Sequence, residues 1–387
     1  MKQTILSILI VLLLLGYTPN SLAEAAGLTG SEPFAGDALC LPGVYAQNPA
    51  DCQALGPSVL LTNLAKKGIT MPLRPLPARS PSPELTKMSI NYAKIDVEPP
   101  ARAAVYSNLE DAVAGRNQQR YLPASPMLYI SYIRKSYVNN KPYVQIASGE
   151  WIRGSPAAYS TFQGLLFDRT PPNSFGWIID QTKPRVAPGY KSMETRITLY
   201  RNTQVQIFDV QTVDGTEWYQ INLDQWVERR AIRQVMINIK PPEGVDNNRW
   251  IEVNLYEQTL SVYDHGQLVF ATLIASGLKP FYTRPGLFKI QTKKATEKMT
   301  GSFEADRSDY YYLEDVPWTM YFDEARALHG AYWRAMFGYT QSHGCVNLSV
   351  GDARWLYDWA NVGDWVYVWD PSGKTPTDPK YYTPGGA

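Results

Sequence analysis

The chain has 387 residues, a length that allows two or three domains, each with its own hydrophobic core. Its 37 Lys and Arg residues balance 36 Asp and Glu residues, so the formal net charge is only +1. This balance argues against a basic nucleic-acid-binding surface and against an acidic solvating tail. The 26 Tyr, 11 Trp, 29 Pro and 27 Gly residues are typical of many short strands and turns. We therefore expect a mainly β fold.

The first 23 residues have the pattern of a secretory signal peptide. Lys2 precedes the apolar run ILSILIVLLLL at 5–15, and the small-x-small sequence SLA follows at 21–23. The run is shorter than the ~20 residues that a membrane-spanning helix needs, and no later run is longer. We expect cleavage after Ala23 and a mature chain without a transmembrane segment, in the periplasm or cell wall. The alternative is an uncleaved membrane anchor.

The three cysteines fit an oxidising compartment. Cys40 and Cys52 lie in the turn-rich segment CLPGVYAQNPADC. A disulfide between them would stabilise the fold by ~3 kcal/mol in the chain-entropy model. We expect this bridge, the alternative being two free thiols in a flexible segment. Cys345 then remains as the odd cysteine, which in a secreted protein is an intermolecular partner or a reactive thiol.

A Pro-rich segment and an internal repeat occupy the middle of the chain. Seven prolines between residues 72 and 100 predict an extended linker. Residues 143–153 align with residues 218–228, and both copies read aromatic-x-Gln-Ile, four residues, then Trp-aliphatic. Two short strands joined by a tight turn, with Ile and Trp packed inward, explain this pattern. Strand-like runs precede each copy, so we expect two small β-barrels. The motif resembles the end of bacterial SH3-like wall-associated domains.

The last third of the chain again has a β pattern. Apolar and polar residues alternate over 250–262, and Asp264-His265-Gly266 is typical of a hairpin turn. The segment DARWLYDWA at 352–360 has apolar residues at helical spacing, which predicts one helix. A closing strand is expected over 363–369, before a tail rich in Pro and Gly.

Few residues in this part can carry chemistry. His343 and Cys345 are two residues apart, so they project from the same face of an extended segment. His329 follows a strand-like run. A cysteine nucleophile needs a nearby imidazole that accepts its proton or holds its thiolate. Gly344 lets a substrate approach the backbone, and its N–H and that of Cys345 are candidate oxyanion donors. Spacing alone does not choose between His329 and His343 as the base.

At this point the sequence resembles a known family. The run SHGCVN at 342–347, with His329-Gly330 upstream, is similar to the signature of the L,D-transpeptidase catalytic domain. Members of this family cross-link peptidoglycan outside the cytoplasm. The stretch SGLKPFYTRPGLFKI at 276–290 resembles the family's SxG…TPxGxFxI pattern, and VPWTMYF at 316–322 resembles its pre-catalytic strand. The marks follow the family's order over about residues 248–370.

The resemblance implies a reaction and a role for each residue. Cys345 would attack the carbonyl of the third residue of a tetrapeptide stem, a diamino acid, and D-Ala would leave. His329, oriented by the backbone carbonyl of Gly330, would be the general base, and His343 would shape the oxyanion pocket beside Gly344. The thioester would pass to the side-chain amine of a second stem, giving a 3→3 cross-link in cell wall biogenesis.

Four further residues are candidates for substrate binding. Ser342 is expected to hydrogen-bond locally rather than to attack. Asn347 stands where many family members have Arg, so the sequence gives less support for a cation that holds the donor's carboxylate at this position. Tyr321 and Trp333 are candidates for lining the donor cleft, although aromatic residues so placed are as often part of the core. No metal site is expected, because apart from His343 and Cys345 no pair of ligand-type residues has metal-site spacing. The reaction that the resemblance implies needs no metal or organic cofactor.

The predicted fold class is mainly β, with two small SH3-like barrels followed by an L,D-transpeptidase β-sandwich that has a short helix after the nucleophile. The expected partners are peptidoglycan stem peptides and glycan, and the chain is expected to be a monomer. The expected division is a signal peptide (1–23), a Cys-pair segment and Pro-rich linker (24–100), SH3-like repeat one (101–160), SH3-like repeat two (161–240), the catalytic domain (248–370) and a flexible tail (371–387).

Three alternatives remain open at this stage. The same thioester could pass to water, which would make the protein an L,D-carboxypeptidase, or to a protein lysine, which would anchor that protein to the wall. The repeats could make it a wall-binding module with a weakly active catalytic domain. A thiol redox protein that uses Cys345 is a third class, which the absence of a CxxC motif argues against.

Overall fold

The computed structural model describes residues 66–69, 73–97, 100–157, 159–302, 304 and 306–382. The chain divides into two units, 1–75 and 76–387, and the account below concerns the second. The predicted signal peptide and the predicted Cys40–Cys52 disulfide lie outside the described residues. Within the described part, no helix has the length and apolar character needed to span a bilayer.

Two β-sheets contain the strands of the predicted catalytic domain. The first has the strand order β1 (Ala78–Arg79), β10 (Leu165–Phe167), β19 (Gln267–Leu273), β18 (Thr259–Asp264), β17 (Arg249–Asn254), β25 (Trp365–Trp369) and β20 (Gly286–Lys289). The second has the order β24 (Val346–Leu348), β23 (Arg326–Gly330), β22 (Tyr311–Asp323), β5 (Met127–Tyr132), β2 (Asn91–Lys94) and β9 (Ser155–Pro156), with β21 (Thr292–Gly301) paired to β22. This confirms the prediction of a mainly β fold.

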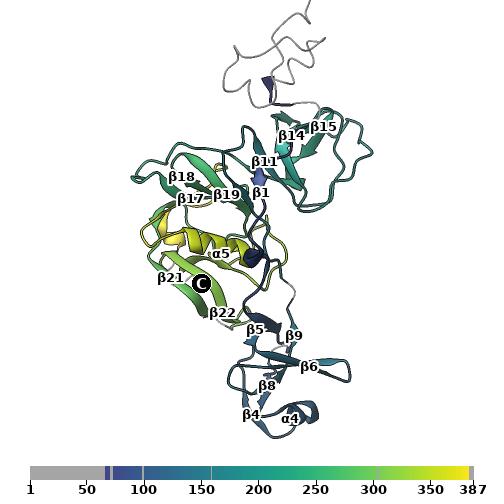
Figure 1. Ribbon diagram of the computed structural model, residues 1–387, viewed down its shortest axis with the longest axis vertical. Coiled ribbons are helices and arrows are strands. Elements are labelled where there is room, and N and C mark those ends of the chain that lie inside the picture. Colours follow the sequence, from purple (N-terminus) through teal and green to yellow (C-terminus); the bar gives the residue numbers. More distant parts are fainter. Residues whose placement is uncertain are drawn as a thin grey trace, which may run out of the picture. The chain divides into compact units, whose positions relative to one another are not determined.

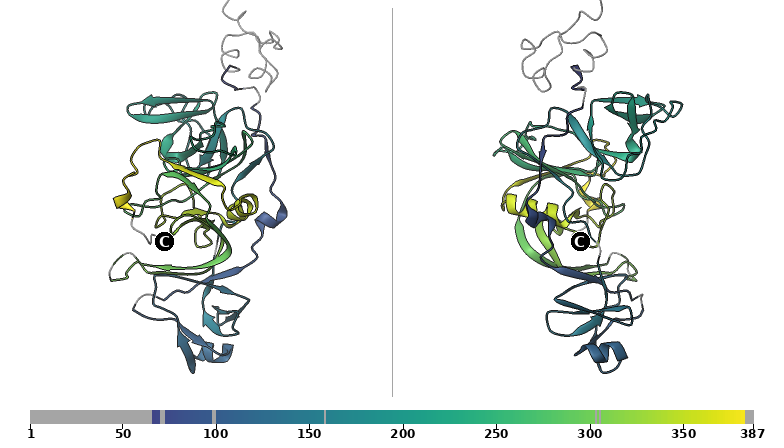
Figure 2. Two further views of the ribbon diagram at one scale, coloured as in Figure 1. Left: turned by 90° about the vertical axis from the view of Figure 1, so that its left-hand side faces the viewer. Right: turned by 45° about the vertical axis from the view of Figure 1, so that its right-hand side comes forward.

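Helix α5 (Val350–Trp359) lies between these sheets (Figures 1 and 2). Its buried face, with Ala353 and Leu356, joins the same hydrophobic core as Val253 of β17 and Leu328 of β23. The helix begins directly after β24, at the N-cap Ser349, whose hydroxyl accepts a hydrogen bond from the Asp352 N–H at 3.3 Å. The predicted short helix after the cysteine is therefore confirmed.

The buried Asp352 carboxylate ties α5 to distant parts of the chain. It accepts hydrogen bonds from the N–H groups of Gln163 and Gly164 at 3.1 and 2.9 Å and from the Thr272 hydroxyl at 2.7 Å. Burial raises the pKa of this carboxyl group, while its hydrogen bonds act in the opposite direction. Residues 163–164 are thereby fixed against the catalytic core.

The sandwich recruits strands from outside the predicted catalytic boundaries. Strands β1 and β2 come from the segment predicted to be a Pro-rich linker, and β10 comes from predicted repeat two. Strand β5, from predicted repeat one, pairs in parallel with β22. The prediction of a plain linker is wrong for residues 78–94. Alternation of apolar and polar residues predicts a strand but does not show which sheet the strand joins. Exposed edge strands have unpaired backbone groups, and the upstream strands pair with such edges of the sandwich.

Two smaller modules are built from the rest of the predicted repeats. Module one is a five-stranded sheet with one short helix. Its elements are β3 (Ala104–Tyr106), α4 (Leu109–Ala114), β4 (Gln118–Tyr121), β6 (Arg134–Val138), β7 (Lys141–Gln145) and β8 (Trp151–Arg153). Module two consists of two three-stranded sheets. Its elements are β11 (Ser174–Ile178), β12 (Gln204–Ile207), β13 (Asp209–Val213), β14 (Thr216–Asn222), β15 (Gln225–Glu228), η3 (Arg229–Ala231) and β16 (Ile232–Val235).

The internal repeat is a β-hairpin in both modules. Gln145 faces Trp151 across β7 and β8, and Gln220 faces Trp226 across β14 and β15. Both tryptophans are buried, as the sequence pattern predicts. The assignment of either module to an SH3-like barrel stays a prediction.

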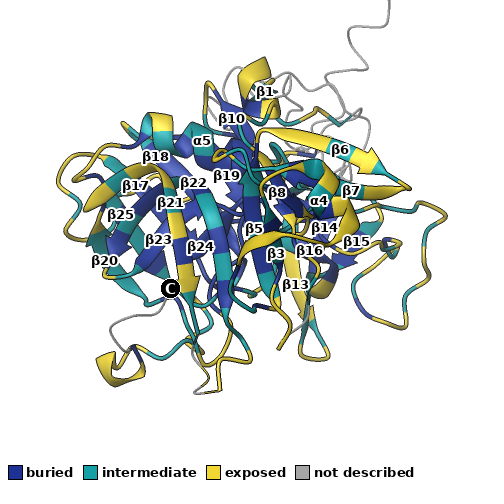
Figure 3. Ribbon diagram, turned by 90° about the horizontal axis from the view of Figure 1, so that it is seen from below, coloured by how far each residue is buried: buried dark blue, intermediate teal, exposed yellow. Residues whose placement is uncertain are grey.

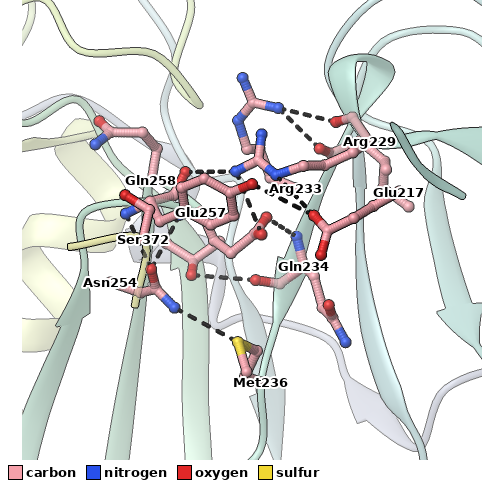
Figure 4. Close-up of polar contacts among 12 residues, drawn as sticks. Glu217, Arg229, Arg233, Gln234, Met236, Asn254, Glu257, Gln258 and Ser372 are labelled. Carbon is pink, nitrogen blue, oxygen red and sulfur yellow. Dashed lines mark hydrogen bonds and ion pairs between the residues drawn. The ribbon is translucent and has the colours of Figure 1, made fainter. Parts of the chain in front are cut away.

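Module two contacts the sandwich at the turn between β17 and β18 (Figure 4). The buried Glu257 of this turn accepts a hydrogen bond from the Gln234 N–H at 2.9 Å and pairs with Arg229 at 3.4 Å. Arg229 also donates to the Tyr256 carbonyl at 2.9 Å and lies 3.5 Å from Glu217. Burial raises the pKa of Glu257, while Arg229 lowers it. Residues of module two thus fix the turn between β17 and β18 by hydrogen bonds and an ion pair.

The segment after Pro371, predicted to be a flexible tail, makes defined contacts as far as Tyr382. It contains the short helix η4 (Pro379–Tyr381). The buried Tyr382 ring lies 5.2 Å from the Arg326 guanidinium, and its hydroxyl donates to the Pro376 carbonyl. Residues 383–387 lie outside the described part.

A substitution at Gly351 tests how closely α5 packs against the backbone of neighbouring segments. A Cβ at this position would overlap the backbone carbonyl oxygens of Leu85 and Thr161. We expect Gly351→Ala to lower the free energy of unfolding by about 3 kcal/mol, because the backbone on both sides must shift. Gly115→Ala, at the open C-terminus of α4 with φ 67°, is the control and should cost only about 1 kcal/mol. Equal urea midpoints for Gly351→Ala and the parent chain would contradict this packing.

Candidate active site

Parallel pairing of two short strands places the candidate nucleophile. Strands β23 and β24 are buried along their whole length (Figure 3), and Leu328 pairs with Val346 and His329 with Asn347. Cys345 directly precedes β24, so it lies beside the strand that carries His329. Residues 342–345, here called the cysteine loop, therefore end next to an imidazole that is distant in sequence.

A single pocket contains most of the predicted site residues. Its lining consists of Met127, Met299, Tyr311, Leu313, His329, Trp333, Arg334, Ser342, His343, Cys345 and Asn347. Both candidate bases and the candidate nucleophile thus face one space. Gly330, Gly344 and Tyr321 do not line it. Tyr321 pairs across the sheet with Ala327, whose N–H donates to the Cys345 sulfur at 3.4 Å.

Local hydrogen bonds set the shape of the cysteine loop. The Ser342 hydroxyl accepts from the Gly344 N–H at 3.1 Å and donates to the Cys345 carbonyl at 2.5 Å. Gly344 has φ 118°, a conformation that favours glycine. Its carbonyl accepts from the Thr283 hydroxyl at 2.8 Å. The Gly344 N–H, one of the two predicted oxyanion donors, is therefore already engaged with Ser342 in this structure.

A second chain of hydrogen bonds supports the loop from the β17–β18 turn. The Gln258 amide donates to the Ser276 hydroxyl at 2.7 Å and accepts from the Ser276 N–H at 2.9 Å. The Ser276 carbonyl in turn accepts from the N–H groups of Gln341 and Ser342 at 2.9 and 3.0 Å. Gln258 adjoins Glu257, the contact point of module two (Figure 4). Module two and the cysteine loop are therefore connected through one turn.

The Cys345 side chain is buried. The side chain is only 6% exposed. The Ala327 N–H donates to the sulfur at 3.4 Å, and the thiol lies 3.8 Å from the Ala325 carbonyl. Burial raises the pKa of the thiol to about 11, although the Ala327 N–H and the Arg326 charge act in the opposite direction. Cys345 is therefore a neutral thiol at neutral pH.

The two pocket histidines have different environments. The Nδ1 atom of the buried His329 lies 3.3 Å from the Gly330 carbonyl, so a proton on Nδ1 leaves Nε2 as the acceptor. Burial and, to a smaller extent, the charge of Arg334 lower the pKa of His329 to about 4, while the hydrogen bond to Gly330 acts in the opposite direction. His343 stacks on Tyr311, with ring centroids 5.6 Å apart, and burial also lowers its pKa. The Gly330 carbonyl thus holds His329 in one tautomer.

Several lining residues were missed by sequence reasoning. Met299, Tyr311 and Leu313 come from β21 and β22, and Met127 comes from predicted repeat one. Arg334 directly follows Trp333, but no motif marks it. The sequence contains no signal that places β5 beside β22, so Met127 was not predictable. Among the described residues, no group of three or more His, Cys, Asp or Glu side chains could hold a metal ion.

The raised pKa of Cys345 has a measurable consequence. Because the thiolate is the reactive form, the rate of alkylation by iodoacetamide should rise about tenfold per pH unit from about pH 7 to about pH 9, without a plateau. Peptide mapping after alkylation, with Cys345→Ser as the control, separates this site from Cys40 and Cys52. A plateau below about pH 8 would show that the resting pocket stabilises a thiolate and would contradict the burial argument.

Comparison with known proteins gives the family of this part of the chain. The L,D-transpeptidase catalytic domain family, YkuD, matches residues 248–368. L,D-transpeptidase 1 of Mycobacterium tuberculosis is 30% identical over 174 residues, which are 41% of this chain and 67% of that protein. The putative L,D-transpeptidase YciB of Bacillus subtilis is 25% identical over 134 residues, 30% of this chain and 63% of that protein.

The chain is also similar to solved structures. A crystal structure of an L,D-transpeptidase from Stackebrandtia nassauensis is 28% identical, with a TM-score of 0.26, and the match covers 34% of this chain and 58% of that one. The chain thus spans about three fifths to two thirds of the relatives named here. By its catalytic domain and its relatives, this chain belongs to the L,D-transpeptidase family.

Proposed function

We propose that this protein is a peptidoglycan L,D-transpeptidase that forms 3→3 cross-links through a thioester on Cys345. The donor is a tetrapeptide stem, and the acceptor is the side-chain amine of a second stem. The observation that carries the proposal is the pocket in which the Cys345 thiol and the neutral His329 face the same space. His329 is oriented there by the Gly330 carbonyl, as a general base requires.

The first half of the reaction starts from neutral groups. Burial disfavours both the thiolate and the imidazolium, so the proton leaves the sulfur only as the sulfur attacks the carbonyl of the third stem residue. His329 Nε2 takes that proton. The C–S bond forms while the carbonyl oxygen becomes an oxyanion, which the Cys345 N–H stabilises. When the oxyanion collapses, the C–N bond breaks and His329 returns the proton to the departing D-Ala amine.

The second half reverses the proton path. The side-chain amine of the acceptor stem attacks the thioester, and His329 takes a proton from that amine. The C–S bond then breaks, and His329 gives the proton to the sulfur, which restores the thiol. No step needs a metal or an organic cofactor.

The remaining predicted residues support this reaction from their positions. Ser342 holds the cysteine loop, because it bonds both Gly344 and Cys345. The Asn347 side-chain oxygen is buried without a hydrogen-bond partner among the described residues, so it can accept from a bound stem. Trp333 lines the pocket, and Tyr321 pairs with Ala327, the residue whose N–H donates to the sulfur. His343 bounds the side of the pocket formed by Tyr311.

The predicted context of the enzyme is the cell wall. We propose that the signal peptide over 1–23 directs secretion to the periplasm or cell wall, and that the chain acts as a monomer. The Cys40–Cys52 disulfide belongs to the same proposal. Modules one and two would hold the catalytic pocket against the glycan, as the repeat motif suggests. A wall pull-down with the full chain and with Cys345→Ser would separate this binding from catalysis.

Product analysis tests the function. The protein is incubated with purified disaccharide-tetrapeptide, and the products are identified by mass spectrometry, with Cys345→Ser as the control. We expect released D-Ala and a dimer joined between the two third residues. Tripeptide alone would indicate a carboxypeptidase, and attachment to a protein lysine would indicate wall anchoring. Absence of any Cys345-dependent product, with wall binding retained, would favour the binding-module alternative.

The two histidines should differ in their effect on acylation. A carbapenem is a convenient reagent, because the family resemblance implies that it acylates the nucleophile. We expect His329→Ala to reduce the rate of acylation of Cys345 by about 100-fold or more, since the proton acceptor is lost. His343→Ala should reduce it less. Intact-mass kinetics measure both rates, and a larger loss in His343→Ala would reverse the two roles.

A further inference from the structure

Arg334 is a pocket cation whose hydrogen bonds are incomplete. It lines the same pocket as Cys345 and His329. Its guanidinium donates to the Gln341 side-chain oxygen at 2.6 Å and to the Gln341 carbonyl. Its Nε atom is buried and has no hydrogen-bond partner among the described residues. A guanidinium has five N–H donors, so this one retains unused donors inside the catalytic pocket.

Among the described residues, no carboxylate pairs with this charge. None of the ion pairs that these residues form includes Arg334. Arg334 lines the pocket together with both histidines, and its charge lowers the pKa of each of them. Burial lowers the pKa of Arg334 to about 10, so it stays protonated at neutral pH. A buried charge without a partner is costly, and such a charge in a binding pocket favours an anionic ligand.

The other pocket residues offer no second cation. The side chain of Asn347, which also lines the pocket, is uncharged. Asp323, a buried carboxylate outside the pocket lining, is already paired with Arg284 and Arg326. Arg334 is thus the cation that lines the pocket among the described residues.

We propose that Arg334 binds a carboxylate of the donor stem peptide and thereby sets the position of the scissile carbonyl over Cys345. This inference rests on the proposed function. The planar guanidinium suits a carboxylate, because two parallel N–H donors match its two oxygens. Two carboxylates of the stem are candidates for this contact. One is the C-terminal carboxylate of the fourth residue. The other is the side-chain carboxylate of the third residue, in stems whose diamino acid has one.

The test compares donors as well as variants. Three tetrapeptide donors are used: one with free carboxylates, one with a C-terminal carboxamide, and one with a carboxamide on the third residue's side chain. Rates of acylation of Cys345 are measured by intact mass for the parent chain, Arg334→Gln and Arg334→Lys. Arg196→Gln, which removes an exposed arginine of module two, is the matched control.

The expected result is a change in donor preference. Cys345 of the parent chain should be acylated about 10- to 100-fold more slowly by one of the two carboxamide donors than by the free donor. That donor is the one whose carboxamide replaces the carboxylate bound by Arg334. The acylation rate of Arg334→Gln with the free donor should fall by about the same factor. This variant should react equally fast with the free donor and with that carboxamide donor. Arg334→Lys should retain part of the preference, and Arg196→Gln all of it.

Contrary results are distinguishable. Equal loss with all three donors in Arg334→Gln would mean that Arg334 only holds Gln341 and the cysteine loop, and would overturn the proposal. Equal rates for all donors in the parent chain would overturn it without any variant, including the case in which Arg334→Gln fails to fold. Absence of acylation of the parent chain by every donor would instead refute the proposed function.

Discussion

The parallel pairing of β23 with β24 is the constraint on which the candidate site depends. It joins a strand that carries His329 to one that begins directly after Cys345, although 16 positions separate the two residues in the sequence. Both strands are buried, and α5 begins directly after β24, so the pair cannot shift in register without moving the core. Backbone hydrogen bonds of the sheet thus hold the proposed nucleophile beside the strand of the proposed base.

Burial gives this arrangement its chemical character. Burial raises the pKa of the thiol and lowers that of His329, so the resting pocket contains no charge on either group. In the proposed reaction, proton transfer therefore accompanies the attack on the substrate carbonyl, which would confine reactivity to bound substrate. Arg334 is the exception, since its positive charge persists in the pocket, and a peptide carboxylate would supply the missing counter-charge.

Local patterns in the sequence predicted the features that depend on neighbouring residues. The repeated hairpins and the helix after the cysteine each follow from short-range spacing. What the sequence did not reveal depends on contacts between distant segments. Strands β1, β2, β5 and β10 join the sandwich from far upstream, and Gln258 supports the cysteine loop from a turn. Periodicity carries no information about such partners.

The most direct measurement is the mass of the covalent intermediate. The chain is mixed with a tetrapeptide donor in the absence of acceptor, quenched in acid, and digested. The account predicts one acyl group per chain on the peptide that contains Cys345. The added mass should equal that of the tetrapeptide donor minus D-Ala. An unmodified Cys345 peptide alongside D-Ala release, or an adduct on another side chain, would contradict it.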